Sequence, residues 1–207
     1  MLTVEDSAQA GFIHAGQLEK ILKREKSYPM GEILSSIKCG DIENRLEKVP
    51  FIEGATCYKT FNGDIQINVR QRLPVLRVMG QNGDNYFIDA NGKIMPQVSY
   101  PANLVIATGN ISKPFATKYL TRIGRFLQGS AFWNNQIEQI NVTDDHQLEL
   151  IPRVGDNVIF LGDPVNTMAK LERLNIFYNK VLSVVGWGKY SEINLEYSNQ
   201  IICTKKE

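Results

Sequence analysis

The chain has few of the residue types on which metal sites and nucleophilic catalysis depend. Its 207 residues include only two histidines and three cysteines, and Cys39, Cys57 and Cys203 are widely spaced, with no C-x-x-C pair. Structural zinc sites need clustered cysteines and histidines, and disulfide frameworks usually have an even number of cysteines. We therefore expect no metal, no cofactor and no disulfide, and we interpret the three cysteines as small apolar packing residues.

Long apolar runs and an excess of charge of one sign are also missing. No segment contains the ~20 consecutive apolar residues of a membrane span, and the first residues do not form a signal peptide. The formal net charge is +1, and the lysines and arginines are spread along the chain, which argues against a surface that binds nucleic acid. We expect either a soluble protein or a segment that begins after a membrane anchor, with no nucleic-acid partner.

Recognisable catalytic motifs are absent too. The sequence has neither a G-x-S-x-G nucleophile elbow nor a phosphate-binding glycine loop, and its scattered carboxylates do not suggest an acid–base pair. Asp144-Asp145-His146 offers oxygen and nitrogen ligands, but no second cluster completes a coordination shell. A solvated turn is the favoured interpretation of this tripeptide, and we predict no enzymatic activity.

What the sequence does contain is a regular succession of helix and strand patterns. Near the start, Leu18, Ile21 and Leu22 share one helix face. Asn62-Gly63 separates two alternating segments, which is typical of a hairpin with a type I′ turn. We predict a strand at 2–5, a helix at 15–25, a helix capped by Asp41 and ended by Pro50, and strands at 55–61 and 64–70.

The segment Arg72-Leu73-Pro74 marks a joint, because proline keeps the backbone extended and removes a ladder donor. After it, Asn82-Gly83 and Asn91-Gly92 separate the strands of a predicted three-stranded meander, and Asp163-Pro164 offers a cap and a first-turn proline for a long helix. We predict strands at 75–80, 85–89, 93–96 and 103–108, a helix at 115–128, strands at 137–142, 147–152 and 157–161, a helix at 163–184, and strands at 193–197 and 200–205.

These elements predict an α+β fold in two domains. Residues 1–72 are expected to form a small β-α-α-β-β domain. Residues 73–207 are expected to form a larger, mostly antiparallel sheet domain with two longer helices.

The first domain resembles the POTRA domain in its element order and in several short patterns. The segment Gln71-Arg72-x-Pro74-Val75 is similar to the exit from this domain in one family, the bacterial cell-division proteins FtsQ and DivIB, although Leu76 stands where that family has alanine. The other patterns are Gly31-x-x-Leu34-x-x-Ile37, Ile42-x-x-x-Leu46 and Val49-Pro50-Phe51-Ile52-x-x-Ala55.

The second domain resembles the same family, with its motifs in the expected order. The tail from Asn199 to Lys205 is similar to the version found in Bacteroidetes-type members. The motifs are Tyr86-Phe87-Ile88-Asp89-x-x-Gly92-x-x-Met95-Pro96, then Val158-Ile159-Phe160-Leu161-Gly162-Asp163, then Lys170-Leu171-x-x-Leu174, and finally Ile193-Asn194-Leu195-x-Tyr197.

The resemblance implies a part in bacterial cell division. Members of the family are non-enzymatic scaffolds of the divisome, held in the inner membrane by one span, with a POTRA domain and a β domain on its periplasmic face at the division septum. They bind the small coiled-coil proteins FtsB and FtsL and help to recruit and regulate the septal peptidoglycan synthase. Their cytoplasmic tail and span have no counterpart here, so the resemblance implies that this chain is the extracytoplasmic part.

The binding site implied by the resemblance is the last strand. In the family a partner segment adds to this strand by β-augmentation, in which main-chain hydrogen bonds supply affinity. We expect Tyr197→Ala, or a charge at Ile201, to weaken FtsB binding and leave the fold intact. The same residues also fit the core-facing and solvated positions of an ordinary terminal strand, and a shift of one residue would exchange the two sets. The candidate residues are Tyr197, Asn199, Ile201, Cys203 and Lys205.

Two other functions remain open from the sequence. The first is a POTRA-containing chaperone or assembly component of outer-membrane or secreted proteins, although such proteins carry several POTRA units or a barrel. The second is an enzyme on an α+β scaffold, which the missing catalytic constellation disfavours. Capture of a single small partner in stoichiometric amount would favour the scaffold, and capture of unfolded barrel strands would favour the chaperone. Turnover by the purified protein would favour the enzyme.

Overall fold

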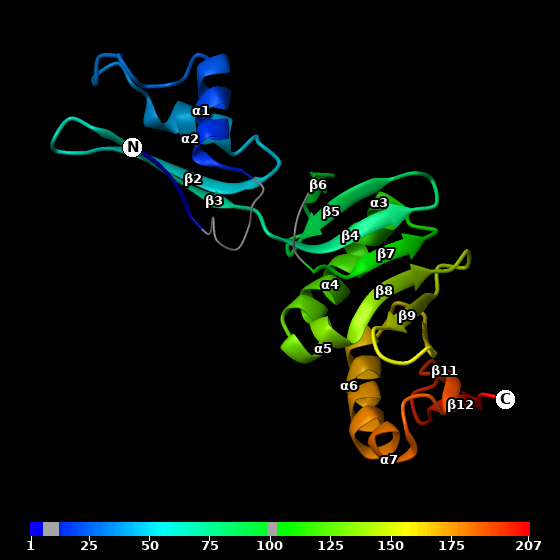
Figure 1. Cartoon of the computed structure of the whole chain (residues 1–207). Helices are drawn as coiled ribbons and strands as arrows, with labels where there is room; N and C mark the ends of the chain where they lie inside the picture. Colours follow the sequence, from blue (N-terminus) through cyan, green and yellow to red (C-terminus); the bar gives the residue numbers. More distant parts are fainter. Residues whose placement is uncertain (6–12, 99–102) are drawn as a thin grey trace. The chain divides into compact units, whose positions relative to one another are not determined.

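A computed structural model describes residues 1–5, 13–98 and 103–207. The chain divides into two compact units, one made of Met1–Leu73 with Met95–Ala102 and the other of Pro74–Ile94 with Asn103–Glu207. Each unit contains its own cluster of buried apolar side chains. Helices and strands are mixed in both (Figure 1), so the predicted α+β class is confirmed.

The first unit is a three-stranded sheet with two helices, in the order β-α-α-β-β. The strand order is β1-β3-β2, with β1 parallel and β2 antiparallel to the central β3. Leu18 and Leu22 of the first helix pack with Ile67 and Val69 of β3, as their periodicity predicts. The elements are β1 (Leu2–Glu5), α1 (Ala15–Arg24), α2 (Cys39–Leu46), β2 (Ile52–Lys59) and β3 (Ile65–Gln71).

Two local predictions for this unit are wrong. Helix α2 begins at Cys39 with Lys38 as its N-cap, so Asp41 lies within the first turn, where its charge still suits the helix dipole. The hairpin is present, but Gly63 is the residue of the Asn62-Gly63 pair that has a positive φ, at 85°. A type I′ turn needs positive φ at both central residues, whereas here the N–H of Gly63 donates to the carbonyl oxygen of Thr60 at 3.1 Å.

The joint after β3 is held by two side chains of the predicted exit motif. Arg72 donates from Nη2 to the carbonyl oxygen of Ile52 at 2.9 Å and from Nε to that of Pro50 at 3.1 Å. Gln71 is buried, and its Oε1 accepts from the N–H of Ile13 at 3.1 Å. The motif therefore fixes the end of β3 to the chain at both ends of the helical region of the first unit.

The second unit is built on a nine-stranded mixed sheet, in the order β12-β11-β10-β9-β8-β7-β4-β5-β6. Parallel pairing occurs between β4 and β7, between β7 and β8, and between β10 and β11, which the sequence patterns did not predict. The predicted meander corresponds to the neighbours β4, β5 and β6. The strands are β4 (Pro74–Gly80), β5 (Asn85–Asp89), β6 (Ile94–Pro96), β7 (Ile106–Gly109), β8 (Ile137–Val142), β9 (Leu148–Pro152), β10 (Val158–Gly162), β11 (Tyr190–Asn194) and β12 (Ile202–Lys205).

Two long helical segments, each containing one π turn, accompany this sheet. In the first, Gly124 lies directly on β4, since an added Cβ would stand 3.1 Å from Cβ of Leu76 and 3.2 Å from the carbonyl oxygen of Val75. A short helix after it, which the sequence did not predict, buries Trp133. The helical elements are α3 (Lys113–Phe115), η1 (Ala116–Leu120), α4 (Thr121–Gln128), α5 (Ala131–Gln136), α6 (Thr167–Phe177), η2 (Tyr178–Leu182) and α7 (Ser183–Val185).

The two faces of the nine-stranded sheet have different side chains. One face packs against the helices through buried residues such as Ile140 and Ile193. Over β7, β8 and β9 the other face carries half-buried polar side chains that form hydrogen bonds with one another. Gln139 donates to Thr108 Oγ1 at 2.8 Å, and Asn141 donates to Glu149 Oε2 at 2.8 Å. Over β7, β8 and β9 the sheet therefore has an apolar face and a hydrogen-bonded polar face.

Candidate partner-binding edge

The last strand, β12, is one of the two edges of the nine-stranded sheet, and among the described strands it pairs with β11 alone. The N–H of Lys206 donates to the carbonyl oxygen of Lys189 at 3.2 Å, and Ser191 Oγ donates to the carbonyl oxygen of Thr204 at 3.3 Å. Both contacts reach toward β11, so even-numbered residues of β12 face that strand. Because main-chain groups alternate along an antiparallel strand, Cys203 and Lys205 direct their N–H and C=O groups to the free edge.

The side chains of β12 point alternately to the two faces of the sheet. Ile201 and Cys203 pack against the apolar core, and Cys203 lies opposite the buried Ile193. Ile202 lies opposite Asn194 on the other face and is 44% exposed. A charge at Ile201 is therefore expected to disturb the core, which corrects the expectation that it would leave the fold intact. The predicted residues nevertheless include Cys203 and Lys205, whose main-chain groups point away from β11.

Tyr197 and Asn199 do not lie on a strand. The predicted strand at 193–197 is displaced, because β11 occupies Tyr190–Asn194 and the chain then turns. Asn194 Oδ1 accepts from the N–H of Glu196 at 2.9 Å, a local bond that competes with continuation of the ladder. Tyr197 and Asn199 are exposed in the loop that leads into β12.

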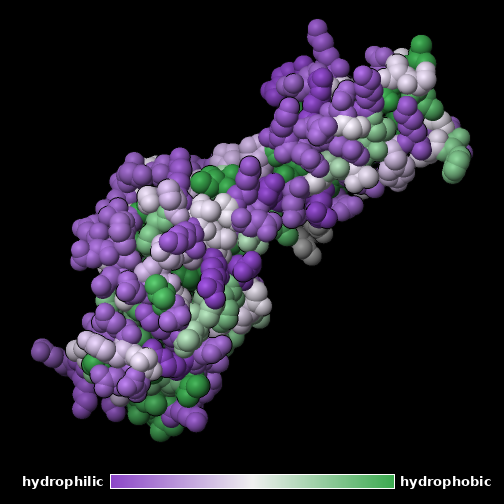
Figure 2. All heavy atoms as spheres, turned by 180° about the vertical axis from the view of Figure 1, so that it is seen from behind, coloured by the Kyte–Doolittle hydropathy of each residue, from purple (hydrophilic) through white to green (hydrophobic). Residues whose placement is uncertain are grey.

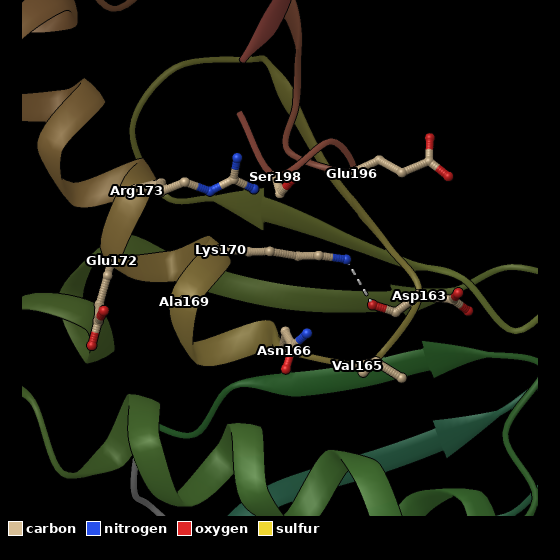
Figure 3. Close-up of a pocket in the computed structure, with 9 residues that line it drawn as sticks. All are labelled: Asp163, Val165, Asn166, Ala169, Lys170, Glu172, Arg173, Glu196 and Ser198. Atoms are coloured by element: carbon tan, nitrogen blue, oxygen red, sulfur yellow. Dashed lines mark hydrogen bonds between the residues drawn. The ribbon is translucent and has the colours of Figure 1, made fainter. Parts of the chain in front are cut away.

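A basic side chain of α6 holds this loop. Arg173 donates from Nη2 to the carbonyl oxygen of Leu195 at 2.7 Å, and its Nη1 donates to that of Tyr197. Figure 3 shows Arg173 and Lys170 extending from α6 on the side where Glu196 and Ser198 lie. Arg173 was not predicted from the sequence. Its spacing of three residues from Lys170, which places both on one helix face, was the available signal.

Lys170, the first residue of the Lys170-Leu171-x-x-Leu174 motif, is buried, and its contacts account for the later start of the helix. The prediction that Asp163 caps this helix is wrong. The Lys170 Nζ is buried and donates to the carbonyl oxygen of Leu161 at 2.6 Å and to that of Asp163 at 3.0 Å. Asp163 is therefore held by its main chain at the end of β10 and does not cap the helix, which begins at Thr167 after Asn166 in a left-handed conformation. Burial lowers the pKa of Lys170.

These two side chains border an open cavity of about 500 Å³ beside the loop. Its lining combines the charged groups of Lys170 and Arg173 with carboxylates of Asp163 and Glu196 (Figure 3) and the exposed Val165. The cavity thus lies between the first turns of α6 and the loop that carries Ser198.

The C-terminal end of β12 is charged. Lys206 forms an ion pair with Asp156 of the β9–β10 loop, and this partner lowers the pKa of Asp156. Lys205 is exposed and forms no ion pair with any described residue. One of the two lysines is therefore engaged in tying the C-terminal end to the sheet, and the other is available at the edge.

Comparison with protein families matches the two parts of the chain separately. Residues 1–70 match the POTRA-like domain. Residues 73–204 match the domain described as FtsQ/DivIB, C-terminal related, which is more than half of the chain. The chain belongs to the FtsQ/DivIB family. Comparison with curated proteins finds no match.

FtsQ/DivIB proteins are non-enzymatic scaffolds of the divisome that interact with other divisome proteins. The family is membrane-anchored and has an extracellular domain. None of the helices that the structure describes in this member is long and apolar enough to cross a bilayer. Within residues 1–5, 13–98 and 103–207, no group of three or more His, Cys, Asp or Glu side chains is placed to hold a metal ion.

This FtsQ/DivIB member also has an apolar surface at one end of its second unit. Figure 2 shows largely hydrophilic side chains over the unit and a hydrophobic patch at the end where α7 lies. Val184 is 81% exposed there, and Ile176 of α6 is 55% exposed. This patch supplies apolar contact area, whereas β12 supplies free main-chain groups and a defined register.

Proposed function

We propose that this chain binds the extracytoplasmic segment of a small FtsB- or FtsL-type coiled-coil protein by adding a strand of that partner to β12. The observation that carries the proposal is that Cys203 and Lys205 direct their main-chain groups to an edge that no strand of the described residues covers. An unpaired edge is an aggregation risk unless it is covered or used. A partner strand removes that risk and gains hydrogen bonds along the edge.

The two faces of the sheet specify the pattern of the partner segment. A strand added at β12 continues both faces, so every second side chain lies beside Ile201 and Cys203 on the apolar side. The intervening side chains lie beside Ile202 and Thr204 on the open side. The bound segment is therefore expected to alternate apolar and polar residues over at least four positions, which is the length of β12.

The loop before β12 extends the proposed site. Tyr197 is 50% exposed, and its carbonyl oxygen is held by Arg173. Asn199 is exposed in the same loop, and Lys205 is free at the far end of the strand. An acidic group of the partner near Lys205 would gain an ion pair, and an apolar side chain would pack on Tyr197. The proposed site comprises Tyr197, Asn199, Ile201, Cys203 and Lys205.

The partner complex would place this chain at the division septum, on the periplasmic face of the inner membrane, and would link the coiled-coil proteins to the septal peptidoglycan synthase. We further propose that residues 1–72 and 73–207 are the two functional domains, the first a POTRA domain with its own edge strands β1 and β2. These assignments are supported by the family and by the availability of the edges.

The test is a titration of the full chain with a synthetic peptide from the extracytoplasmic end of a coiled-coil division partner encoded in the same genome. We expect saturable one-to-one binding, with slower amide exchange at Cys203 and Lys205 and weaker binding for Tyr197→Ala. A scrambled peptide of the same composition is the control. Equal binding of the scrambled peptide and of unfolded barrel strands would instead favour a chaperone, and unchanged exchange along β12 would refute the site.

A further inference from the structure

Two cysteines of the first unit lie on neighbouring elements, one on a helix and the other on the strand that this helix contacts. Cys39 is the first residue of α2, and Cys57 lies near the middle of β2. Cys57 is 6% exposed within the apolar cluster of this unit, and the half-buried Cys39 packs against the same cluster. Widely spaced in the sequence, the two residues are neighbours in the fold.

A hydrogen bond of α2 fixes the register between these elements. Glu43 Oε1 accepts from the main-chain N–H of Cys57 at 2.7 Å. Glu43 follows Cys39 by four residues, so both side chains lie on one face of the helix. The same helix face that brings the carboxylate to Cys57 therefore also brings the thiol of Cys39 to it.

Burial and the neighbouring side chain of Cys39 both act on the thiol of Cys57. Burial raises the pKa of the Cys57 thiol to about 12, and the side-chain contact with Cys39 adds to that rise. Cys57 is therefore a poor nucleophile while it is enclosed. Cys39 is the more accessible of the two and is the one that a thiol reagent reaches first.

We propose that Cys39 and Cys57 form an intramolecular disulfide that joins α2 to β2. The expectation that all three cysteines are only packing residues would then hold for Cys203 alone. The oxidant is a small disulfide of the glutathione class. The thiolate of Cys39 attacks one sulfur of this disulfide, forms a mixed disulfide and releases one small thiol. The thiolate of Cys57 then attacks the Cys39 sulfur and expels the second small thiol, so that the oxidant gains the two electrons and the two protons that the cysteines lose.

The bond would have a consequence for the edge of the first sheet. β2 is an edge strand of that sheet, and Glu43 covers one of its main-chain donors, the N–H of Cys57. A disulfide from the start of α2 holds the helix, and with it Glu43, over the middle of β2. It would therefore close this position to a partner strand while leaving β1 and β12 unaffected.

The proposal depends on the proposed function only for its compartment, since disulfides persist where the surroundings are oxidising. A test on purified protein is independent of that. We suggest the full chain with Cys203→Ala, equilibrated with oxidised glutathione and then titrated for free thiols in denaturant. The free thiols are expected to fall from two to zero, the intact mass to fall by two hydrogen atoms, and one peptide to contain Cys39 linked to Cys57.

Three results would overturn the proposal, namely two thiols that stay free, a lasting glutathione adduct on Cys39, and a disulfide between two chains. Cys39→Ser in the same background is the matched control and should keep its single thiol unlinked. The wild-type chain guards against a folding defect of the variants, because oxidation should remove two of its three thiols and slow exchange of the Cys57 amide. In cells, oxidised thiols are expected only if the chain is extracytoplasmic, so their absence there with success in vitro would count against the proposed function alone.

Discussion

Arg173 Nη2 donates to the carbonyl oxygen of Leu195 at 2.7 Å, across 22 positions of sequence. The guanidinium also holds the carbonyl of Tyr197, so one side chain of α6 fixes the chain between the end of β11 and the start of β12. The position of the edge strand β12 thus depends on α6, a helix that precedes both β11 and β12 in the sequence. Several consequences can be measured.

Arg173→Ala is expected to weaken partner binding about tenfold, roughly 1.4 kcal/mol, because the loop before β12 must then be ordered on binding. Arg173→Lys should be intermediate, since an ammonium cannot form the two-pronged contact. Calorimetric titration with the partner peptide measures the loss. Faster amide exchange at 195–199 should accompany it, and binding of wild-type strength by Arg173→Ala would exclude this positioning role.

Proline scanning separates the free edge from the paired side of β12. Lys205→Pro removes an N–H that faces outward, so the fold should survive while partner binding falls. Thr204→Pro removes an N–H on the side of β11 and should lower the free energy of unfolding by about 1–3 kcal/mol. Urea unfolding and peptide titration provide the two measurements, and Lys205→Ala controls for the lost charge. If Lys205→Pro unfolds the chain and Thr204→Pro does not, the orientation derived for β12 is reversed.

Charges at the neighbouring positions 201 and 202 should have very different effects on stability. Ile201→Asp places a carboxylate against the core and is expected to cost about 2 kcal/mol or more. Ile202→Asp places it on the open face and should leave the unfolding midpoint within about 0.5 kcal/mol of wild type. Chemical denaturation of the two variants decides the matter, and equal stability would contradict the assigned faces.

Tyr86 should make the stability fall at alkaline pH. Its buried hydroxyl has no hydrogen-bond partner among the described residues, and burial, aided by Asp84, raises the pKa of Tyr86 to about 12. An unfolded tyrosine has a pKa of about 10, so above that pH the unfolded state releases its proton first and the free energy of unfolding falls. Tyr86→Phe should remove this part of the fall and be as stable as wild type at neutral pH. Urea unfolding at several pH values checks both, and identical slopes for the two proteins would rule the assignment out.

Lys170→Met keeps the length of the side chain and removes the ammonium that binds the carbonyls of Leu161 and Asp163. We expect a loss of about 1–3 kcal/mol, because the buried carbonyl of Leu161 and the half-buried carbonyl of Asp163 lose their donor. The lowered pKa of Lys170 means that the unfolded state binds the proton more tightly, so wild type gains stability as pH rises toward the unfolded pKa. The deficit of the variant should therefore widen at alkaline pH. Thermal unfolding at neutral and alkaline pH measures the loss of stability. A Lys170→Met variant as stable as wild type would show that Lys170 does not hold the end of β10.

Most elements could be predicted from the sequence where local chemistry agrees with the fold. The alternation of Ile67 and Val69 predicted the buried face of β3, and both are buried. Gly186, with φ of 92°, ends the long helical segment where the glycines around Trp187 predicted a break. Family membership was also readable from the sequence, since the order of short motifs is a property of the chain and needs no coordinates.

Prediction from the sequence failed where a contact with a residue distant in the sequence overrode the local structural preference. Asp163 is a good cap by itself, but Lys170 binds its carbonyl, and the helix starts later. The sequence around Ile193 continues to alternate through Tyr197, but Asn194 turns the chain and Arg173 holds the turn. The parallel pairing of β10 with β11 likewise joins strands separated by a whole helical segment.

The edge strand β12 shows which properties the sequence determines and which the tertiary structure determines. The amino-acid sequence alone determined that residues near the C-terminus form a strand, and its composition argued against a nucleic-acid-binding surface. Only the tertiary structure decided that this strand lies at an edge, that Ile201 and Cys203 face the core, and that the main-chain groups of Cys203 and Lys205 are free. Strand propensity and alternation are local, whereas an edge is defined by which strand is not paired beside it, and that depends on the whole sheet.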